Sequence, residues 1–295
     1  MAFILKRICK ECIPQKMQNR IRTIIWYCRG GKEQLKACLF RCMFFFCQPT
    51  SPKQIAMKDW AFGGKLNHYP YRWIGEYDKI YPEGKDDNGM SYVIHRGKRL
   101  YIKRSDGDSI QQIYKNLLIE QDSRSAHRYV KKISELRGKT LLDIGCAEAL
   151  FTLDVIEEVR YAYLFECDEE WIEALEQTFA PWKEKITIVR KYVSNETDEN
   201  CLRLDDYFKD QVMDDLFIKM DIEGYERKAL IGGLRLLKNN NVQGSVCVYH
   251  RPDDPEVISE ILKNCGYNSS IEEKYIYFGG AFRLCMLRMS KRTAI

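Results

Sequence analysis

The sequence lacks any apolar run long enough to cross a membrane. The most apolar stretch near its beginning, residues 42–47, is six residues long and follows Arg41, whereas a membrane-spanning helix needs about 20 apolar residues. The same stretch is too short to act as a secretory signal. These absences favour a cytoplasmic location, where thiols stay reduced.

Complete metal-ligand motifs are also lacking, although the chain has 12 cysteines. Cys9 and Cys12 have the spacing of a metal or redox pair, but no second pair with matching spacing and no nearby histidine accompanies them. A structural zinc site normally takes four such ligands. We therefore expect free or buried thiols and no metal bound by these cysteines.

Outside the first 60 residues the chain has no excess of positive charge. Residues 1–60 hold 12 Lys/Arg against 3 Asp/Glu, which leaves 35 against 39 for the rest. A slightly acidic body disfavours binding to nucleic-acid phosphates. The Asn/Asp-Pro-Pro-Tyr/Phe type of motif found in enzymes that act on a flipped base is absent as well. We therefore expect no nucleic-acid partner.

Composition divides the chain into three regions. Residues 1–52 are predicted to be a basic, cysteine-rich helical arm, with Gly30 and Gly31 between two segments. Residues 53–115 are an aromatic-rich accessory region, whose hairpin at 91–103 is expected to cover the main domain, 116–295. For the arm we favour packing on its own body or self-association with a sister subunit. A peripheral membrane role, or binding to nucleic acid, stays open.

The stretch around which the main domain is organised is TLLDIGCAEALF, residues 140–151. It predicts a buried strand, a tight turn and the start of a helix. Gly145, Ala147 and Ala149 stand where glycines usually allow a nucleotide-like ligand to approach, which alone is a weak signal. Asp143 precedes the glycine, and Glu166 ends the next predicted strand 21 residues after Gly145. That spacing is typical of a carboxylate that binds ribose hydroxyls.

Strands and helices alternate regularly after residue 140. A helix is predicted at 110–136, followed by strands at 140–142, 161–166, 186–189, 216–220 and 245–249. Two last strands, 275–278 and 282–287, are joined by three residues, too few for a crossover helix, and are therefore antiparallel. The pattern predicts an α/β fold with the seven-stranded, Rossmann-like sheet of class I methyltransferases. A nicotinamide-binding sheet fits less well, because its first strand usually enters the glycines without a preceding acid.

S-adenosyl-L-methionine suits this arrangement because it carries a ribose diol, an ammonium and a sulfonium group. Glu166 is expected to accept the ribose hydroxyls, while Asp143 and the backbone after it meet the amino-acid end. The complete set of candidate cofactor-binding residues is Asp143, Gly145, Cys146, Glu148, Glu166, Cys167, Ser194 and Asp221.

Several motifs in order carry a family resemblance. LLDIGCAEALFTLD, LDDYF, FIKMDIEGYERKALIGG and VYHRPDDPEVI closely resemble the FkbM family of S-adenosylmethionine-dependent methyltransferases, over about residues 117–290. Tyr225 replaces a small residue of the family pattern, and Ala149 replaces a frequent glycine. The resemblance implies O-methylation of a hydroxyl on a sugar, glycan or other secondary metabolite. Other interpretations are a non-catalytic cofactor-binding scaffold and, less favoured, a nucleic-acid methyltransferase.

Candidate catalytic residues follow the fourth and fifth predicted strands: Asp221, Glu223 and His250. Methyl transfer needs alignment of the reactants and a base for the hydroxyl proton. His250 is expected to act as that base or to orient the acceptor hydroxyl, with Asp221 beside it. In an alternative mechanism, Asp221 and Glu223 bind a divalent metal that acidifies the hydroxyl; the sequence alone does not require one.

Overall fold

A computed structural model describes residues 15–63, 66, 68–103, 109–209, 211, 213 and 215–291, with side chains from residue 31 onward. The chain forms two compact units, Met1–Arg72 and Trp73–Ile295. The first 14 residues of the predicted arm, including Cys9 and Cys12, lie outside the described residues. The predicted domain boundaries at 52 and 115 stay predictions.

In the first unit, helix α2 (Gln15–Phe46) is followed by α3 (Pro52–Phe62). α2 continues through residues 30 and 31, so the predicted division of the arm into two helical segments is wrong. The Ser51 side chain caps α3 by accepting a hydrogen bond from a backbone N–H of its first turn, and Pro52 occupies the first helical position, where a missing N–H costs nothing. The Phe40 and Trp60 rings, 6.2 Å apart, pack the two helices together.

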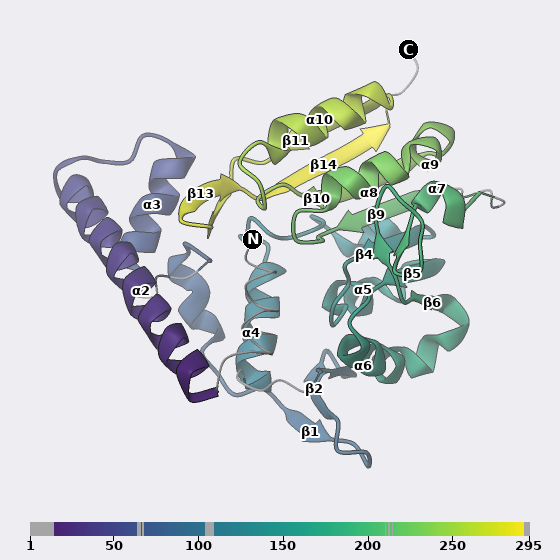
Figure 1. Ribbon diagram of the computed structural model, residues 1–295, viewed down its shortest axis with the longest axis horizontal. Coiled ribbons are helices and arrows are strands. Elements are labelled where there is room, and N and C mark those ends of the chain that lie inside the picture. Colours follow the sequence, from purple (N-terminus) through teal and green to yellow (C-terminus); the bar gives the residue numbers. More distant parts are fainter. Residues whose placement is uncertain are drawn as a thin grey trace. The chain divides into compact units, whose positions relative to one another are not determined.

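The second unit contains a seven-stranded sheet of class I methyltransferase topology, with helices on both faces (Figure 1). Its strands, in order, are β11 (Tyr267–Ile271), β14 (Met286–Lys291), β10 (Val242–Cys247), β9 (Leu216–Met220), β4 (Thr140–Ile144), β5 (Tyr161–Phe165) and β6 (Ile186–Val189). The last strand in the chain, β14, runs antiparallel to both of its neighbours, and the β10-β9-β4-β5-β6 pairs are parallel. The predicted fold class is confirmed.

The C-terminal strands differ from the prediction. β12 (Tyr275–Phe278) and β13 (Ala281–Leu284) form the expected antiparallel hairpin, but as a separate two-stranded sheet. The main sheet uses β14 and the edge strand β11 instead. β11 was not predicted because its centre, Asn268-Ser269-Ser270, is polar and exposed, and such residues have low strand propensity.

The predicted helix at 110–136 is only partly correct. The helix α4 (Ile110–Glu120) begins as predicted but is 11 residues long, and after a turn region the 3-10 helix η2 (Ile133–Leu136) precedes β4. The Asp122 side chain accepts the backbone N–H of Arg124, and the Arg128 guanidinium donates to the carbonyls of Gln121 and Val130. These side chains satisfy backbone groups that a helix would have paired. The non-helical segment 121–132 therefore contributes residues to the site described below.

The accessory region contains the predicted hairpin, with β2 (Ser91–His95) and β3 (Lys98–Tyr101), and an additional short strand β1 (Glu83–Lys85). This small sheet packs on α6 (Glu169–Phe179), where the backbone N–H of Tyr101 donates to Thr178 Oγ1 at 3.0 Å. Among the described helices, none combines the length and apolar character that crossing a membrane requires.

The remaining elements connect the sheet. They are α5 (Leu150–Val155), η3 (Ala180–Lys185), β7 (Tyr192–Val193), β8 (Cys201–Leu202), α7 (Leu204–Tyr207), α8 (Glu226–Gly232), α9 (Leu234–Asn239) and α10 (Asp254–Asn264). α8 ends at Gly232, whose backbone packs closely against Ser194, the residue that follows β7. A Cβ added at position 232 would lie 1.9 Å from the carbonyl oxygen of Ser194.

Because of this close approach, we expect Gly232→Ala to lower the free energy of unfolding by about 1 to 3 kcal/mol, as overpacked core sites do. Urea unfolding followed by circular dichroism measures the change. Gly75→Ala is the matched control, since the nearest atom to its new Cβ would be 3.9 Å away. Equal stability of the two variants would contradict the packing described here.

Candidate functional site

The site lies where the strand order reverses, at the carboxyl ends of β4 and its neighbours β5 and β9, the usual ligand position in open α/β sheets. Gly145 follows β4 with a φ of +73°, and an added Cβ would lie 2.1 Å from the carbonyl oxygen of Asp221 after β9. The backbone N–H of Asp221 in turn donates to Ile144 at 3.1 Å. Only glycine fits at position 145, and it brings the two loops together.

The two alanines of the same loop adopt the backbone conformation of glycine. Ala147 and Ala149 have φ angles of +46° and +54°. This left-handed conformation costs an L-residue roughly 1 to 2 kcal/mol. The Gly-x-Ala-x-Ala pattern therefore keeps the geometry of a glycine-rich loop despite lacking two of its glycines, and stores some strain.

A buried ion pair lies directly beneath this loop. Asp143 in β4 and Lys219 in β9 are register partners, and their side chains meet at 2.9 Å between Oδ1 and Nζ. Thr152 donates to the other carboxylate oxygen at 2.6 Å, and Lys219 Nζ also donates to the Gly145 carbonyl at 2.5 Å. Burial alone would lower the pKa of Lys219, but the negative charges of Asp143 and Asp221 outweigh it and raise that pKa. Asp143 is 0% exposed, so its carboxylate stabilises the loop from below.

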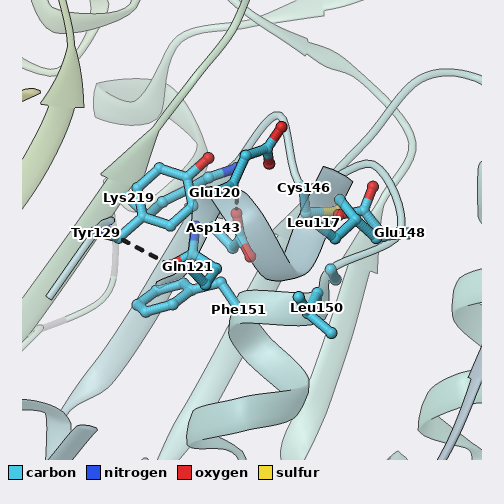
Figure 2. Close-up of a pocket in the computed structure, with 11 residues that line it drawn as sticks. Leu117, Glu120, Gln121, Tyr129, Asp143, Cys146, Glu148, Leu150, Phe151 and Lys219 are labelled. Atoms are coloured by element: carbon cyan, nitrogen blue, oxygen red, sulfur yellow. Dashed lines mark hydrogen bonds and ion pairs between the residues drawn. The ribbon is translucent and has the colours of Figure 1, made fainter. Parts of the chain in front are cut away.

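A cavity of about 20 Å³ lies beside the loop, with Asp143 and Lys219 side by side in its wall (Figure 2). Its lining comes from α4, Tyr129, the β4–α5 loop, α5 and β9: Leu117, Glu120, Gln121, Tyr129, Asp143, Cys146, Glu148, Ala149, Leu150, Phe151 and Lys219. This volume is sufficient for roughly one water molecule. Burial, and then the charge of Glu120, raises the pKa of Glu148 to about 8. The carboxyl groups give the cavity the character of a cation site.

Glu166 follows β5 on the other side of the same loop. Its Oε2 accepts the N–H of Ala147 at 3.0 Å, and its Oε1 accepts the N–H groups of Cys167 and Asp168 at 2.7 and 3.0 Å. The carboxylate is half-buried and held by three backbone donors, so its position relative to Gly145 is fixed.

Two tyrosine hydroxyls and two imidazole rings surround the carboxylate of Asp221, after β9. Tyr129 donates to Oδ2 at 3.0 Å and Tyr249 to Oδ1 at 3.2 Å. His127 Nε2 lies 3.2 Å from Oδ2, and His250 Nε2 lies 3.5 Å from Oδ1. Burial alone would raise the pKa of Asp221, but the His127 hydrogen bond and the charges of His127, Lys219 and His250 hold it far below its ordinary value. The carboxylate is therefore ionised.

His250 lies between two carboxylates. Its Nδ1 is 2.9 Å from Glu226 Oε1, on the side of the ring opposite to Asp221, and both His250 and Glu226 are buried. Burial lowers the pKa of His250, but the hydrogen bond and charge of Glu226, followed by the charges of Asp221 and Glu223, outweigh it and raise the pKa. The pKa of His127 is raised in the same way, chiefly by Asp221 and Glu120 against the effect of burial. Both rings therefore hold a proton more readily than a free imidazole does.

Glu223 has a left-handed backbone conformation. Its φ is +55°, which for a non-glycine residue costs energy and is often found at functional sites. Its side chain is 83% exposed and its carboxylate lies 3.8 Å from His250 Nε2. The buried Glu226 holds this loop by accepting the N–H groups of Ile222 and Gly224.

The structure thus assembles most of the predicted site residues, in two neighbouring groups. Asp143, Cys146 and Glu148 line the cavity. Gly145 lies in the loop beside it, and Glu166 accepts a hydrogen bond from Ala147 of the same loop. Asp221, Glu223 and His250 form the second group.

The remaining predicted cofactor-binding residues are Cys146, Cys167 and Ser194. Burial raises the pKa of the Cys146 thiol well above its ordinary value, and that of Cys167 to about 11. Ser194, which follows β7, hydrogen-bonds Asn195 at 3.4 Å and contacts Gly232. Their roles in cofactor binding stay predictions.

Sequence reasoning missed five members of the site: His127, Tyr129, Lys219, Glu226 and Tyr249. Lys219 had a usable signal, because a lysine inside the apolar strand LFIKM requires a buried partner. Tyr249 and Glu226 stand within the quoted family motifs. His127 and Tyr129 had no signal, since they lie in a segment predicted as helix.

Two groups of side chains are close enough to consider as metal ligands: His127, Asp221 and Cys247, and Asp221, Glu226 and His250. In the second group Nε2 of His250 faces Asp221 and Nδ1 faces Glu226. In the first group Asp221 Oδ2 also accepts a hydrogen bond from Tyr129. Metal binding at either group stays a hypothesis.

Comparison with known proteins decides the family. The model of the Methyltransferase FkbM domain matches residues 108–269, more than half of the chain. The chain belongs to the FkbM methyltransferase family. As a member, it is an S-adenosylmethionine-dependent methyltransferase, and the family resemblance stated from its motifs is confirmed.

Solved structures include similar folds. The FkbM methyltransferase of Methylobacillus flagellatus KT is 18% identical, with a TM-score of 0.43 over 63% of this chain and 56% of that one. This chain therefore spans little more than half the length of that relative. A precorrin-6y C5,15-methyltransferase of Geobacter metallireducens GS-15 is 13% identical (TM-score 0.37; 55% of this chain, 85% of that one).

An rRNA methylase of Streptococcus thermophilus is 9% identical, with a TM-score of 0.38 over 55% of this chain and 92% of that one. A comparison with curated protein sequences finds no match. The family assignment rests on the domain match alone.

The strained loop yields a prediction for this FkbM methyltransferase. Ala149→Gly should raise the free energy of unfolding by about 1 kcal/mol, because it removes the cost of the left-handed conformation. Ala174→Gly in α6 is the control and should lower it by about 1 kcal/mol, since glycine weakens a helix. Urea unfolding of both variants measures the sign. Destabilisation by Ala149→Gly would show that its side-chain packing outweighs the backbone strain.

Proposed function

We propose that the chain transfers a methyl group to a hydroxyl of a sugar, glycan or other secondary metabolite. The observation that carries this proposal is the carboxylate of Asp221, 15% exposed and surrounded by two tyrosine hydroxyls and two imidazole rings, at the strand end next to Gly145. A fixed carboxylate at this position can accept a hydrogen bond from an acceptor hydroxyl. The family match supports methyl transfer; the acceptor class is the part proposed here.

For the cofactor, the loop and its flanking acids provide a fitting set of groups. Gly145 leaves room for close approach of a ligand, Glu166 offers a carboxylate to the ribose hydroxyls, and Glu148 with Glu120 offers carboxyl oxygens to the ammonium group. S-adenosylmethionine would supply an activated methyl on its sulfonium. Asp143 contributes by holding the loop through Lys219 rather than through direct exposure to a ligand.

The acceptor hydroxyl is proposed to bind between Asp221 and Glu223. Asp221 accepts its hydrogen bond and orients the oxygen, but its low pKa makes it a weak proton acceptor. Glu223, exposed to solvent and close to His250, takes the proton as the carbon–oxygen bond forms and passes it to water. His250, held between Asp221 and Glu226, is proposed as a positioning residue.

An assay that detects demethylated cofactor tests the function. The purified chain is incubated with S-adenosylmethionine and, separately, with sugars, glycans and nucleic acid. Cofactor turnover with a hydroxyl acceptor supports the proposal. Tight cofactor binding without turnover on any acceptor would favour the scaffold interpretation, and turnover on nucleic acid alone would overturn the acceptor class. Activity should survive exhaustive chelation, because the imidazoles of His127 and His250, rather than a metal ion, lie next to the Asp221 carboxylate.

Glu166→Gln should weaken cofactor binding by roughly tenfold to a hundredfold, because charged hydrogen bonds contribute about 1.5 to 3 kcal/mol. Calorimetry with S-adenosylmethionine and with its demethylated product measures the effect. The control is Glu173→Gln, an exposed position on the adjacent helix α6. Unchanged affinity in a folded Glu166→Gln variant would remove this residue from the site.

The pKa of His250 is raised above its unfolded value of 6.5. Its contribution to stability is therefore fully present below pH 6.5 and is lost as pH rises through the raised value. We expect the stability difference between wild type and His250→Asn to shrink with increasing pH, measured by urea unfolding at several pH values. A difference that grows with pH would mean that the ring is neutral in the folded state.

The same protonation state separates the two catalytic roles. With His250 as a charged positioning residue, kcat should fall as pH rises through its pKa; with His250 as the base, kcat should rise instead.

Glu223→Gln should lower kcat by about 10² to 10⁴ while leaving cofactor affinity unchanged, as loss of a general base does. Wild-type turnover in that variant would assign the proton to another group.

A further inference from the structure

Helix α2 has two apolar faces, and among the described side chains of its own unit only one face has a partner. Ala37, Phe40 and Phe44 follow each other at helical spacing on the face turned to α3, where Phe40 meets Trp60 and Arg41 Nε donates to the Ala61 carbonyl at 2.7 Å. Ala37 and Phe44 are buried. This face accounts for the packing of the helix pair.

The opposite face carries a second row of large apolar side chains in contact with water. Leu35, Leu39, Cys42 and Phe46 are spaced by four, three and four residues, which places them in one line along the helix. Leu35, Leu39 and Phe46 are 63%, 60% and 83% exposed. Phe45, next to the line, is exposed as well. Contiguous exposed apolar surface of this kind marks an interaction site.

The charge of the helix distinguishes between the surfaces that could cover this row. Residues 15–46 contain seven Lys/Arg and a single Glu. In the described part, Lys32 and Lys36 lie one helical turn apart, beside the exposed row. Two copies of so basic a helix would repel each other. An anionic surface would gain from each basic residue near it, and the long basic side chains can lie along its charged layer while the apolar row enters it.

We infer that α2 docks on an anionic membrane surface, with Leu35, Leu39 and Phe46 entering the lipid and the flanking Lys and Arg residues binding the headgroups. The helix lies in the plane of the interface, in keeping with its amphipathic character. Nucleic acid is a poorer occupant, because phosphates offer nothing to the leucine and phenylalanine side chains. The inference does not depend on the proposed methyl acceptor.

Vesicle co-sedimentation of the full chain under reducing conditions tests the inference. Wild type should sediment with phosphatidylcholine vesicles that contain phosphatidylserine, less so at high salt, and remain in the supernatant with phosphatidylcholine alone. Leu35→Ser/Leu39→Ser should lower the partition coefficient at least about tenfold, with unchanged cofactor affinity. Ile80→Ser, at a 92% exposed position of the other unit, is the control and should bind as wild type does.

Three results would overturn it. The first is failure of wild type to sediment with anionic vesicles, and the second is sedimentation of Leu35→Ser/Leu39→Ser as complete as that of wild type. The third is a wild-type dimer in light scattering that the double variant loses while vesicle binding is absent, which would make this face a contact between copies of the chain. None of these results would alter the methyltransferase assignment, which cofactor binding and turnover test separately.

Discussion

The ion pair between Asp143 and Lys219 is the interaction on which the rest of the site depends. It joins the two central strands at the point where both leave the sheet, and Lys219 extends it to the carbonyl of Gly145. Removing one partner of a buried pair typically costs 3 to 5 kcal/mol, because the other charge stays buried without compensation. Lys219 thus holds the β4–α5 loop and adds its positive charge to those of His127 and His250 near Asp221.

From that pair, charge alternates outward through the site. Glu226, His250, Asp221, His127 and Glu120 form a series in which each imidazole stands between two carboxylates, at 2.9, 3.5, 3.2 and 3.9 Å. In a medium of low polarity such a series stabilises every member in its charged form. This explains why Asp221 stays ionised although burial alone would favour its neutral form.

The functional division of the chain follows its two compact units. The family domain begins at residue 108, well inside the second unit, and all of the site residues belong to that unit. The first unit contributes a helix pair with exposed apolar side chains. The site residues and the proposed membrane-binding surface thus belong to different parts of the chain.

Much of the fold was predictable because its signals are local. The apolar strands, the Asp143–Gly145 turn and the spacing from Gly145 to Glu166 each depend on neighbouring residues, and the family motifs named the chemistry directly. Propensity failed where side chains replace backbone pairing, as Asp122 and Arg128 do after α4, and where a polar segment serves as the edge strand β11.

The catalytic cluster could not be predicted in the same way. His127 and Tyr129 meet Asp221 across 94 and 92 positions of sequence, and no local pattern records such a contact. Sequence alone determined which strand ends carry acids and that a carboxylate would stand near the cofactor loop. Only the tertiary structure decided that His250 lies between two carboxylates, because Asp221 and Glu226 reach the ring through folding. Its pKa depends on the charges that folding brings within a few ångströms of the buried ring.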